Sequence, residues 1–134
     1  MDSWRARVRV FAAAGALLTI VVGVLGRTLP TIGNATGGIA YTLLLALIAL
    51  LLWPAASPTA LAGGATGVSF AVELFQMTPI PKAITNEVPA LHFLIGASFR
   101  WMDLLWYAVG GVVAFGAVLL IHRLARGRQR SHVR

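Results

Sequence analysis

Cysteine is absent from this chain of 134 residues, and charged residues are scarce. Without cysteine there can be no disulfide bonds, thiolate metal ligands or cysteine nucleophiles, and the redox environment of the protein stays open. Asp, Glu, Lys and Arg make up 11% of the residues, whereas a typical soluble domain contains about 25%. Hydrophobic residues reach 58%, with a mean hydropathy of +0.82. This composition indicates a membrane protein.

Charge is missing altogether from three long stretches, at residues 10–26, 28–72 and 104–121. A membrane helix needs about 20 apolar residues to cross a hydrocarbon core of about 30 Å. Four segments come close to this length, at about residues 10–26, 35–53, 60–77 and 103–122. We therefore predict an all-α membrane protein with four transmembrane helices, in which residues 1–134 form a single domain.

Basic residues lie mainly outside these segments, with the excess at the two ends of the chain. The positive-inside rule then predicts a multi-pass protein whose termini are both cytoplasmic. Juxtamembrane arginines also contact anionic lipid head groups of the bilayer. We expect such contacts for Arg5, Arg7, Arg9, Arg123, Arg126, Arg128 and Arg130. A nucleic-acid interface is not expected, because no soluble domain is present to carry one.

Glu73 is the one charged residue inside the apolar segment 60–77. A carboxylate at membrane depth costs about 2.5–3.5 kcal/mol on insertion scales, so such residues face a partner, a bundle interior or a water-filled cavity. Glu73 forms a stripe with three other polar side chains, and successive members are 3, 4 and 3 residues apart. On a helix these four side chains point in directions within about 80° of one another. The members of this polar stripe are Thr66, Ser69, Glu73 and Gln76.

A second stripe on the same helix consists of small residues, on the side opposite Glu73. Small residues let membrane helices approach closely, so we expect this helix to pack through them at the centre of the bundle. The leucine-rich second helix is expected at the periphery, and a further small face is predicted on the last helix at Gly110 and Gly111. The small stripe of the third helix comprises Ala60, Gly63, Gly64, Gly67 and Ala71.

Further polar residues are predicted at the same outer face as Glu73 and Gln76, namely Arg27, Arg100 and Asp103. Two acids, an amide and two guanidinium groups would form an outward-facing polar pocket there. The structural alternative is that a Glu–Arg pair holds helix ends together and that Asp103 is a helix N-cap.

The connection between the last two predicted helices contains three prolines. Lys82 and Glu87 are expected in a solvated polar loop. The apolar segment Val88–Phe99 is too short to span, so we predict an interfacial or re-entrant segment. His92 has no second histidine at ligand spacing, so no metal site is expected. No nucleotide-binding, cofactor or hydrolase motif occurs, so no cofactor is expected and catalytic residues stay unknown.

Two motifs resemble those of a known family. V-E-L-F-Q at residues 72–76 and L-I-G-A-S-F-R-W-M-D-L-L-W-Y-A-V-G at residues 94–110 are similar to the small bacterial membrane family called domain of unknown function 2809. That family in turn resembles the VanZ-like proteins. The residues that carry the resemblance are Glu73, Gln76, Gly96, Phe99, Asp103, Tyr107 and Gly110. We expect a location in the bacterial inner membrane.

The chain departs from the family in two places. The family tends to have an acid before an L-W pair where this chain reads G-G-I-A-Y, at residues 37–41, and an arginine where it reads T-N-E-V, at residues 85–88. The family has no established activity to carry over. VanZ-like proteins are linked to glycopeptide tolerance and envelope functions, which implies only an envelope setting.

Three functions therefore stay open. The first is an envelope binding or interaction protein, whose pocket holds a head group or a partner helix. The second is a membrane enzyme acting on a lipid-linked or phosphate-bearing envelope substrate, with Glu73 as general base and Arg27 or Arg100 binding phosphate. The third is a small transporter or channel subunit, which needs a homo-oligomer because four helices enclose little volume.

Overall fold

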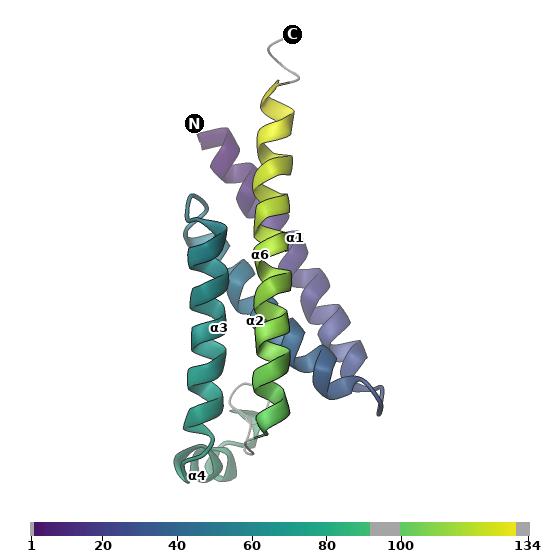
Figure 1. The fold of residues 1–134 in the computed structure, drawn as a ribbon, viewed down its shortest axis with the longest axis vertical. Coiled ribbons are helices and arrows are strands. Elements are labelled where there is room, and N and C mark those ends of the chain that lie inside the picture. The colour runs from purple at the N-terminus through teal and green to yellow at the C-terminus, as the bar shows by residue number, and fades with distance from the viewer. Residues whose placement is uncertain (1, 92–99, 131–134) are drawn as a thin grey trace.

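The computed structural model describes residues 2–91 and 100–130, and this part of the chain is helical throughout apart from turns. The long helices alternate in direction (Figure 1). The start of α1, the end of α6 and the α2–α3 turn lie at one end of the bundle, which we call the termini end. The opposite end carries α4, and we call it the α4 end. The elements are α1 (Asp2–Arg27), α2 (Gly33–Leu52), α3 (Pro58–Phe75), α4 (Ile80–Glu87), the 3₁₀ turn η1 (Pro89–Leu91) and α6 (Trp101–Arg130).

Three of the described helices, α1, α2 and α6, are long and apolar enough to cross a membrane. The predicted all-α membrane fold is thus supported. Helix α3 is not among the helices whose length and hydropathy suit a membrane crossing, so the fourth crossing stays a prediction. A broad apolar face of α1 is exposed, which is rare in soluble monomers and natural for a helix in lipid. It includes Val10, Leu17, Leu18, Val24 and Leu25.

Helix ends follow local signals that hydropathy does not report. Ser57 begins α3, because its hydroxyl accepts the Ala60 N–H at 3.1 Å and Pro58 occupies the first turn, where proline is tolerated. Helix α6 begins at Trp101, so Asp103 lies in its first turn and the predicted N-cap role is wrong. Both α1 and α6 extend through the arginines near the chain ends, since arginine is a good helix former.

The predicted polar loop around Lys82 and Glu87 is instead the short helix α4. Pro79 and Pro81 are compatible with this helix, because they stand at its N-cap and in its first turn, where a missing N–H costs nothing. Beyond α4, Val88 is its C-cap and η1 follows. The rest of the predicted interfacial or re-entrant segment, including His92, Gly96 and Phe99, lies outside the described residues.

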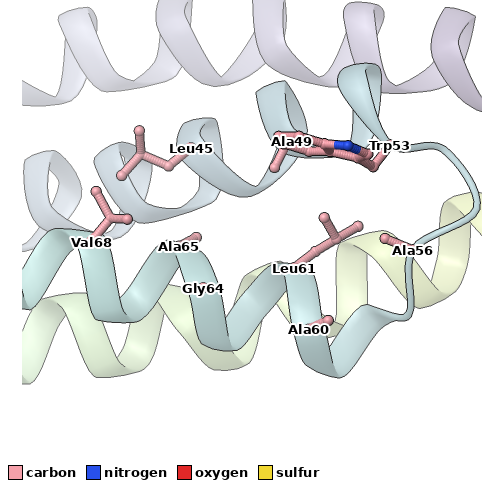
Figure 2. Close-up of a pocket in the computed structure, with 9 residues that line it drawn as sticks. All are labelled: Leu45, Ala49, Trp53, Ala56, Ala60, Leu61, Gly64, Ala65 and Val68. Carbon is pink, nitrogen blue, oxygen red and sulfur yellow. The ribbon is translucent and has the colours of Figure 1, made fainter.

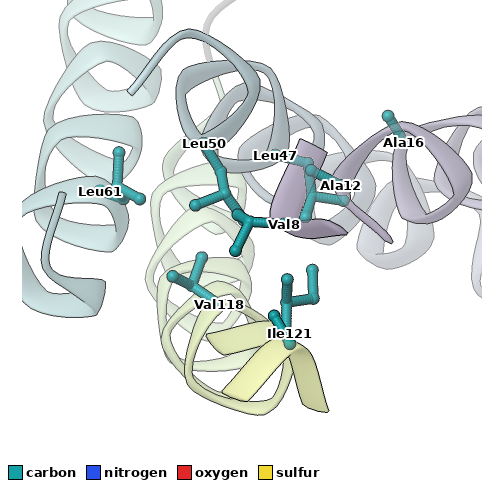
Figure 3. Packing of buried hydrophobic residues seen from close by; sticks show 9 residues of the cluster. Val8, Ala12, Ala16, Leu47, Leu50, Leu61, Val118 and Ile121 are labelled. Atoms are coloured by element: carbon teal, nitrogen blue, oxygen red, sulfur yellow. The ribbon is translucent and has the colours of Figure 1, made fainter. Parts of the chain in front are cut away.

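Helix α2 is the central helix of the bundle, and it packs on α1, α3 and α6. Helix α3 lies at the edge and packs on α2 and α6. The predicted positions of these two helices are therefore wrong. Leucines of α2 are buried because α1 and α6 cover them, in a core near the termini end (Figure 3). The largest members of this core are Val8, Leu47, Leu50, Leu61, Val118 and Ile121.

The small stripe of α3 makes no close contact with a neighbouring helix, contrary to prediction. A Cβ atom added at Gly63, Gly64 or Gly67 would meet no atom within 4 Å. Helix α3 packs instead through the side that carries Leu61, Ala62, Ala65, Ser69 and Glu73, all buried.

Close helix approach is made by glycines elsewhere, as predicted for α6. A Cβ atom at Gly110 would lie 2.9 Å from the Cβ atom of Thr42, and one at Gly111 would collide with the Thr66 hydroxyl. On α2, a Cβ atom at Gly38 would lie 2.8 Å from the Trp106 Cβ atom. These contacts bring α2, α3 and α6 together around the polar residues of α3.

Candidate functional site

The Glu73 side chain is completely buried between α3 and α6. Its Oε1 atom accepts the backbone N–H of Arg100 at 2.9 Å, and its Oε2 atom accepts the hydroxyl of Tyr107 at 3.0 Å. A buried carboxylate without such donors would be strongly unfavourable. The Arg100 N–H belongs to the start of α6, where the first N–H groups have no partner within the helix. Glu73 thus caps α6 from a neighbouring helix.

Asp103 stands beside Glu73, in the first turn of α6. Its carboxyl group is half-buried and interacts electrostatically with the Glu73 carboxyl group. Asp103 also interacts electrostatically with Arg100, whose side chain is exposed. The α4 end of the bundle therefore carries an acid pair with a cation at its edge.

A layer of hydroxyl groups continues from this acid pair toward the middle of the bundle. Ser69 lies one helical turn before Glu73, and its Oγ atom is 2.9 Å from the Oγ1 atom of Thr42, with both residues completely buried. The Tyr41 and Tyr107 rings lie 5.9 Å apart at the same level. Polar contacts thus join α2, α3 and α6 at one place, which we call the carboxyl site: Tyr41, Thr42, Ser69, Glu73, Arg100, Asp103 and Tyr107.

Of the five residues predicted to form a polar pocket, three lie together: Glu73, Arg100 and Asp103. Gln76 follows one turn later as the half-buried C-cap of α3, with its backbone N–H 3.1 Å from both the Val72 and the Glu73 carbonyl oxygens.

Arg27 does not join the carboxyl site. It is exposed at the end of α1, and its Nε atom lies 3.3 Å from where a Cβ atom of Gly37 would be. The α1–α2 turn that follows it stands well apart from α4 (Figure 1). Among the residues that the structure describes, the groups interacting with the Glu73 carboxyl group do not include Arg27.

Tyr107 and Thr42 belong to the site, although neither was predicted there. Tyr107, one of the residues that carry the family resemblance, is 9% exposed and donates its hydroxyl group to Glu73. The available signal was its spacing of four residues from Asp103, which puts both side chains on one face of a helix. Thr42 was a lone hydroxyl in an apolar helix, and such residues commonly make hydrogen bonds between membrane helices.

The polar layer ends well before the termini end. Beyond Ser69 the space between α2, α3 and α6 is filled by Ala46, Ala62, Ala65 and Ala114, and then by the larger apolar core. Within residues 2–91 and 100–130 no group of three or more His, Asp or Glu side chains is arranged to hold a metal ion. The site is a closed polar cluster that reaches the surface through Asp103 and Arg100.

A second polar cluster lies at the termini end. The His122 ring, which is buried, has its Nε2 atom 3.0 Å from the Pro54 carbonyl oxygen. The Trp4 ring lies 5.5 Å from the His122 ring, and the Arg126 guanidinium is 5.6 Å from the Trp4 ring. These contacts connect α1 and α6 with the α2–α3 turn.

A family model described as "protein of unknown function (DUF2809)" matches residues 27–111, which is more than half of the chain. The chain belongs to this family. The match contains the whole carboxyl site of this DUF2809 protein, whereas His122 and most of α1 lie outside it. Comparisons with curated proteins and with solved structures gave no match. Membership of DUF2809 therefore identifies the region that the family shares without assigning it an activity.

Proposed function

We propose that this DUF2809 protein is a binding or interaction protein of the bacterial envelope. In this proposal Arg100 and Asp103 contact the ligand, and Glu73 positions them. The observation that carries the proposal is the buried Glu73 carboxylate, which caps the first turn of α6 and so holds the backbone of that turn in place. A site whose groups are held in advance loses less entropy when a ligand binds.

The arginine distribution supports an orientation in which the carboxyl site faces outward. The termini end carries exposed arginines on both α1 and α6, which suits contact with anionic lipid head groups at a cytoplasmic surface. The α4 end then lies at the outer surface of the inner membrane. Trp101, which is 72% exposed next to Arg100, suits the interface between membrane and water.

The chemistry of the exposed groups favours a head group that carries phosphate. A guanidinium can donate two parallel hydrogen bonds to phosphate, which gives geometric specificity as well as charge. The Arg100 side chain is exposed and therefore accessible to such a group. The half-buried Asp103 beside it suits an amine or hydroxyl group on the same ligand.

The two alternative functions receive less support. As a general base, Glu73 would have to reach a substrate proton, but both of its oxygens already accept hydrogen bonds and the side chain has no exposed surface. As a transport path, the polar layer would have to continue across the bundle, but alanines and leucines close it beyond Ser69.

Native mass spectrometry of the purified protein tests this proposal. The protein should retain phosphate-bearing lipids, and Arg100→Gln should reduce that retention about tenfold, which corresponds to about 1.4 kcal/mol. Lys82→Gln is the matched control, because Lys82 is an exposed cation on α4 at the same end of the bundle. Equal retention by wild type and both variants would contradict a head-group site at Arg100.

A further inference from the structure

An apolar groove runs between α2 and α3 from the α2–α3 turn toward the middle of the bundle, and none of its lining residues belongs to the carboxyl site (Figure 2). Its volume is about 340 Å³. Side chains from the two helices face each other across it, and the α2–α3 turn closes one end. The main lining residues are Leu45, Ala49 and Trp53 of α2 and Leu61, Gly64 and Val68 of α3.

The groove exists because α3 has a glycine, Gly64, at the position where a larger side chain would fill it. A Cβ atom added at Gly64 would meet no other atom within 4 Å, and Ala49 on the facing helix is also small. Val68 is 51% exposed at the side of the groove. At membrane depth the surrounding medium is hydrocarbon, and an apolar cavity of this kind stays free of water. A hydrocarbon chain is therefore the natural material to occupy it.

The closed end of the groove has the features of a membrane interface. Trp53 follows the last residue of α2 and is 61% exposed, as is usual for tryptophan at the level of lipid head groups. The Nε atom of Arg9 donates to the Leu51 carbonyl oxygen at 3.1 Å, which fixes a guanidinium at the same end of α2. Further exposed arginines at this end are Arg5, Arg123 and Arg126. The electrostatic field at this end of the groove is thus positive.

We propose that the groove binds one acyl chain of an anionic phospholipid, whose head group lies beside Trp53 and Arg9. The positive charge at the closed end complements the lipid phosphate. A second copy of this chain, packed through the same face in parallel, would instead bring its own arginines to the same level, where like charges repel. This lipid site is separate from the carboxyl site and does not depend on the function proposed for it.

Filling the groove tests the proposal. The Cβ atom that Gly64→Leu adds meets no other atom within 4 Å, and leucine favours helix over glycine, so the fold should persist. Gly116→Leu is the control, because a Cβ atom there on α6 also meets nothing within 4 Å but lies outside the groove. Both proteins are placed in nanodiscs of phosphatidylcholine with a minor fraction of phosphatidylglycerol, and retained lipid is measured by native mass spectrometry after release.

The variants are compared in an Arg100→Gln background, which removes the head-group site proposed above. In that background the protein with Gly64 intact and the Gly116→Leu control should retain phosphatidylglycerol, and Gly64→Leu should reduce its retention about tenfold, equivalent to about 1.4 kcal/mol. Arg9→Gln should lower the preference for phosphatidylglycerol over phosphatidylcholine. Unchanged retention by Gly64→Leu would overturn the proposal. So would efficient disulfide cross-linking of Gly64→Cys in native membranes, which would show a second copy in the groove. The cross-link is unambiguous because the chain has no other cysteine.

Discussion

The hydroxyl group of Tyr107 on α6 donates a hydrogen bond of 3.0 Å to the Glu73 carboxylate on α3, between two buried side chains 34 positions apart. The same carboxylate caps the backbone of α6 at Arg100. Glu73 therefore has a structural role whatever else the site does, and the following predictions separate that role from ligand binding.

Tyr107→Phe should destabilise the protein by about 1–3 kcal/mol, because one oxygen of a buried carboxylate loses its donor. The measurement is thermal unfolding in detergent. Tyr41→Phe serves as the comparison, since it keeps the ring contact with Tyr107 and leaves the hydrogen bonds of Glu73 intact. A loss of stability equal in the two variants would show that the Tyr107 hydroxyl is not a special donor to Glu73.

Glu73→Gln should leave the protein folded but less stable by about 1.5–3 kcal/mol, because hydrogen bonds to a charged acceptor become bonds to a neutral one. Adding Arg100→Gln should not restore stability, since Arg100 donates its backbone N–H, which that substitution leaves in place. Unfolding of the single and double variants in detergent measures the difference. Rescue by Arg100→Gln would mean that the guanidinium, and not the backbone, is the group that Glu73 neutralises.

Gly110→Ala should destabilise the fold by about 1–3 kcal/mol through overpacking. The added Cβ atom would lie 2.9 Å from the Thr42 Cβ atom and 3.0 Å from the Ile39 carbonyl oxygen, and the latter is backbone that cannot move aside. Gly67→Ala is the control and should be neutral or stabilising, because its Cβ atom meets open space and alanine favours helix. If Gly67→Ala were the more damaging change, the small stripe of α3 would have to pack against a partner.

Reporter fusions should place the termini end in the cytoplasm. A reporter that is active only there should work when fused after Arg134 and fail when inserted near Asn86 in α4. The reason is the excess of arginine at the termini end. The reverse pattern would put the carboxyl site at the inner surface and remove the outward-facing site from the proposed function.

Several features followed from local properties of the sequence. The all-helical membrane fold was evident from charge-free segments of spanning length, because hydropathy depends only on nearby residues. The burial of Glu73 was also predictable, since an isolated carboxylate in an apolar helix has to avoid lipid. Asp103 and Arg100 lie near it in the structure, because the lengths of the helices bring the end of α3 and the start of α6 to one surface.

Only the tertiary structure decided which faces pack and which residues meet. Leu47, expected in lipid, is 2% exposed in the core, and Gly67, expected in a helix interface, is exposed. Two further features could not be predicted without the tertiary structure. One is the hydrogen bond from Tyr107 to Glu73, and the other is the central position of α2. The physical reason is that lipid tails are as apolar as leucine, so hydrophobic periodicity does not distinguish the inside of a membrane bundle from its outside. Contact is decided there by the shapes of neighbouring helices and by buried hydrogen bonds, which involve residues far apart in the chain.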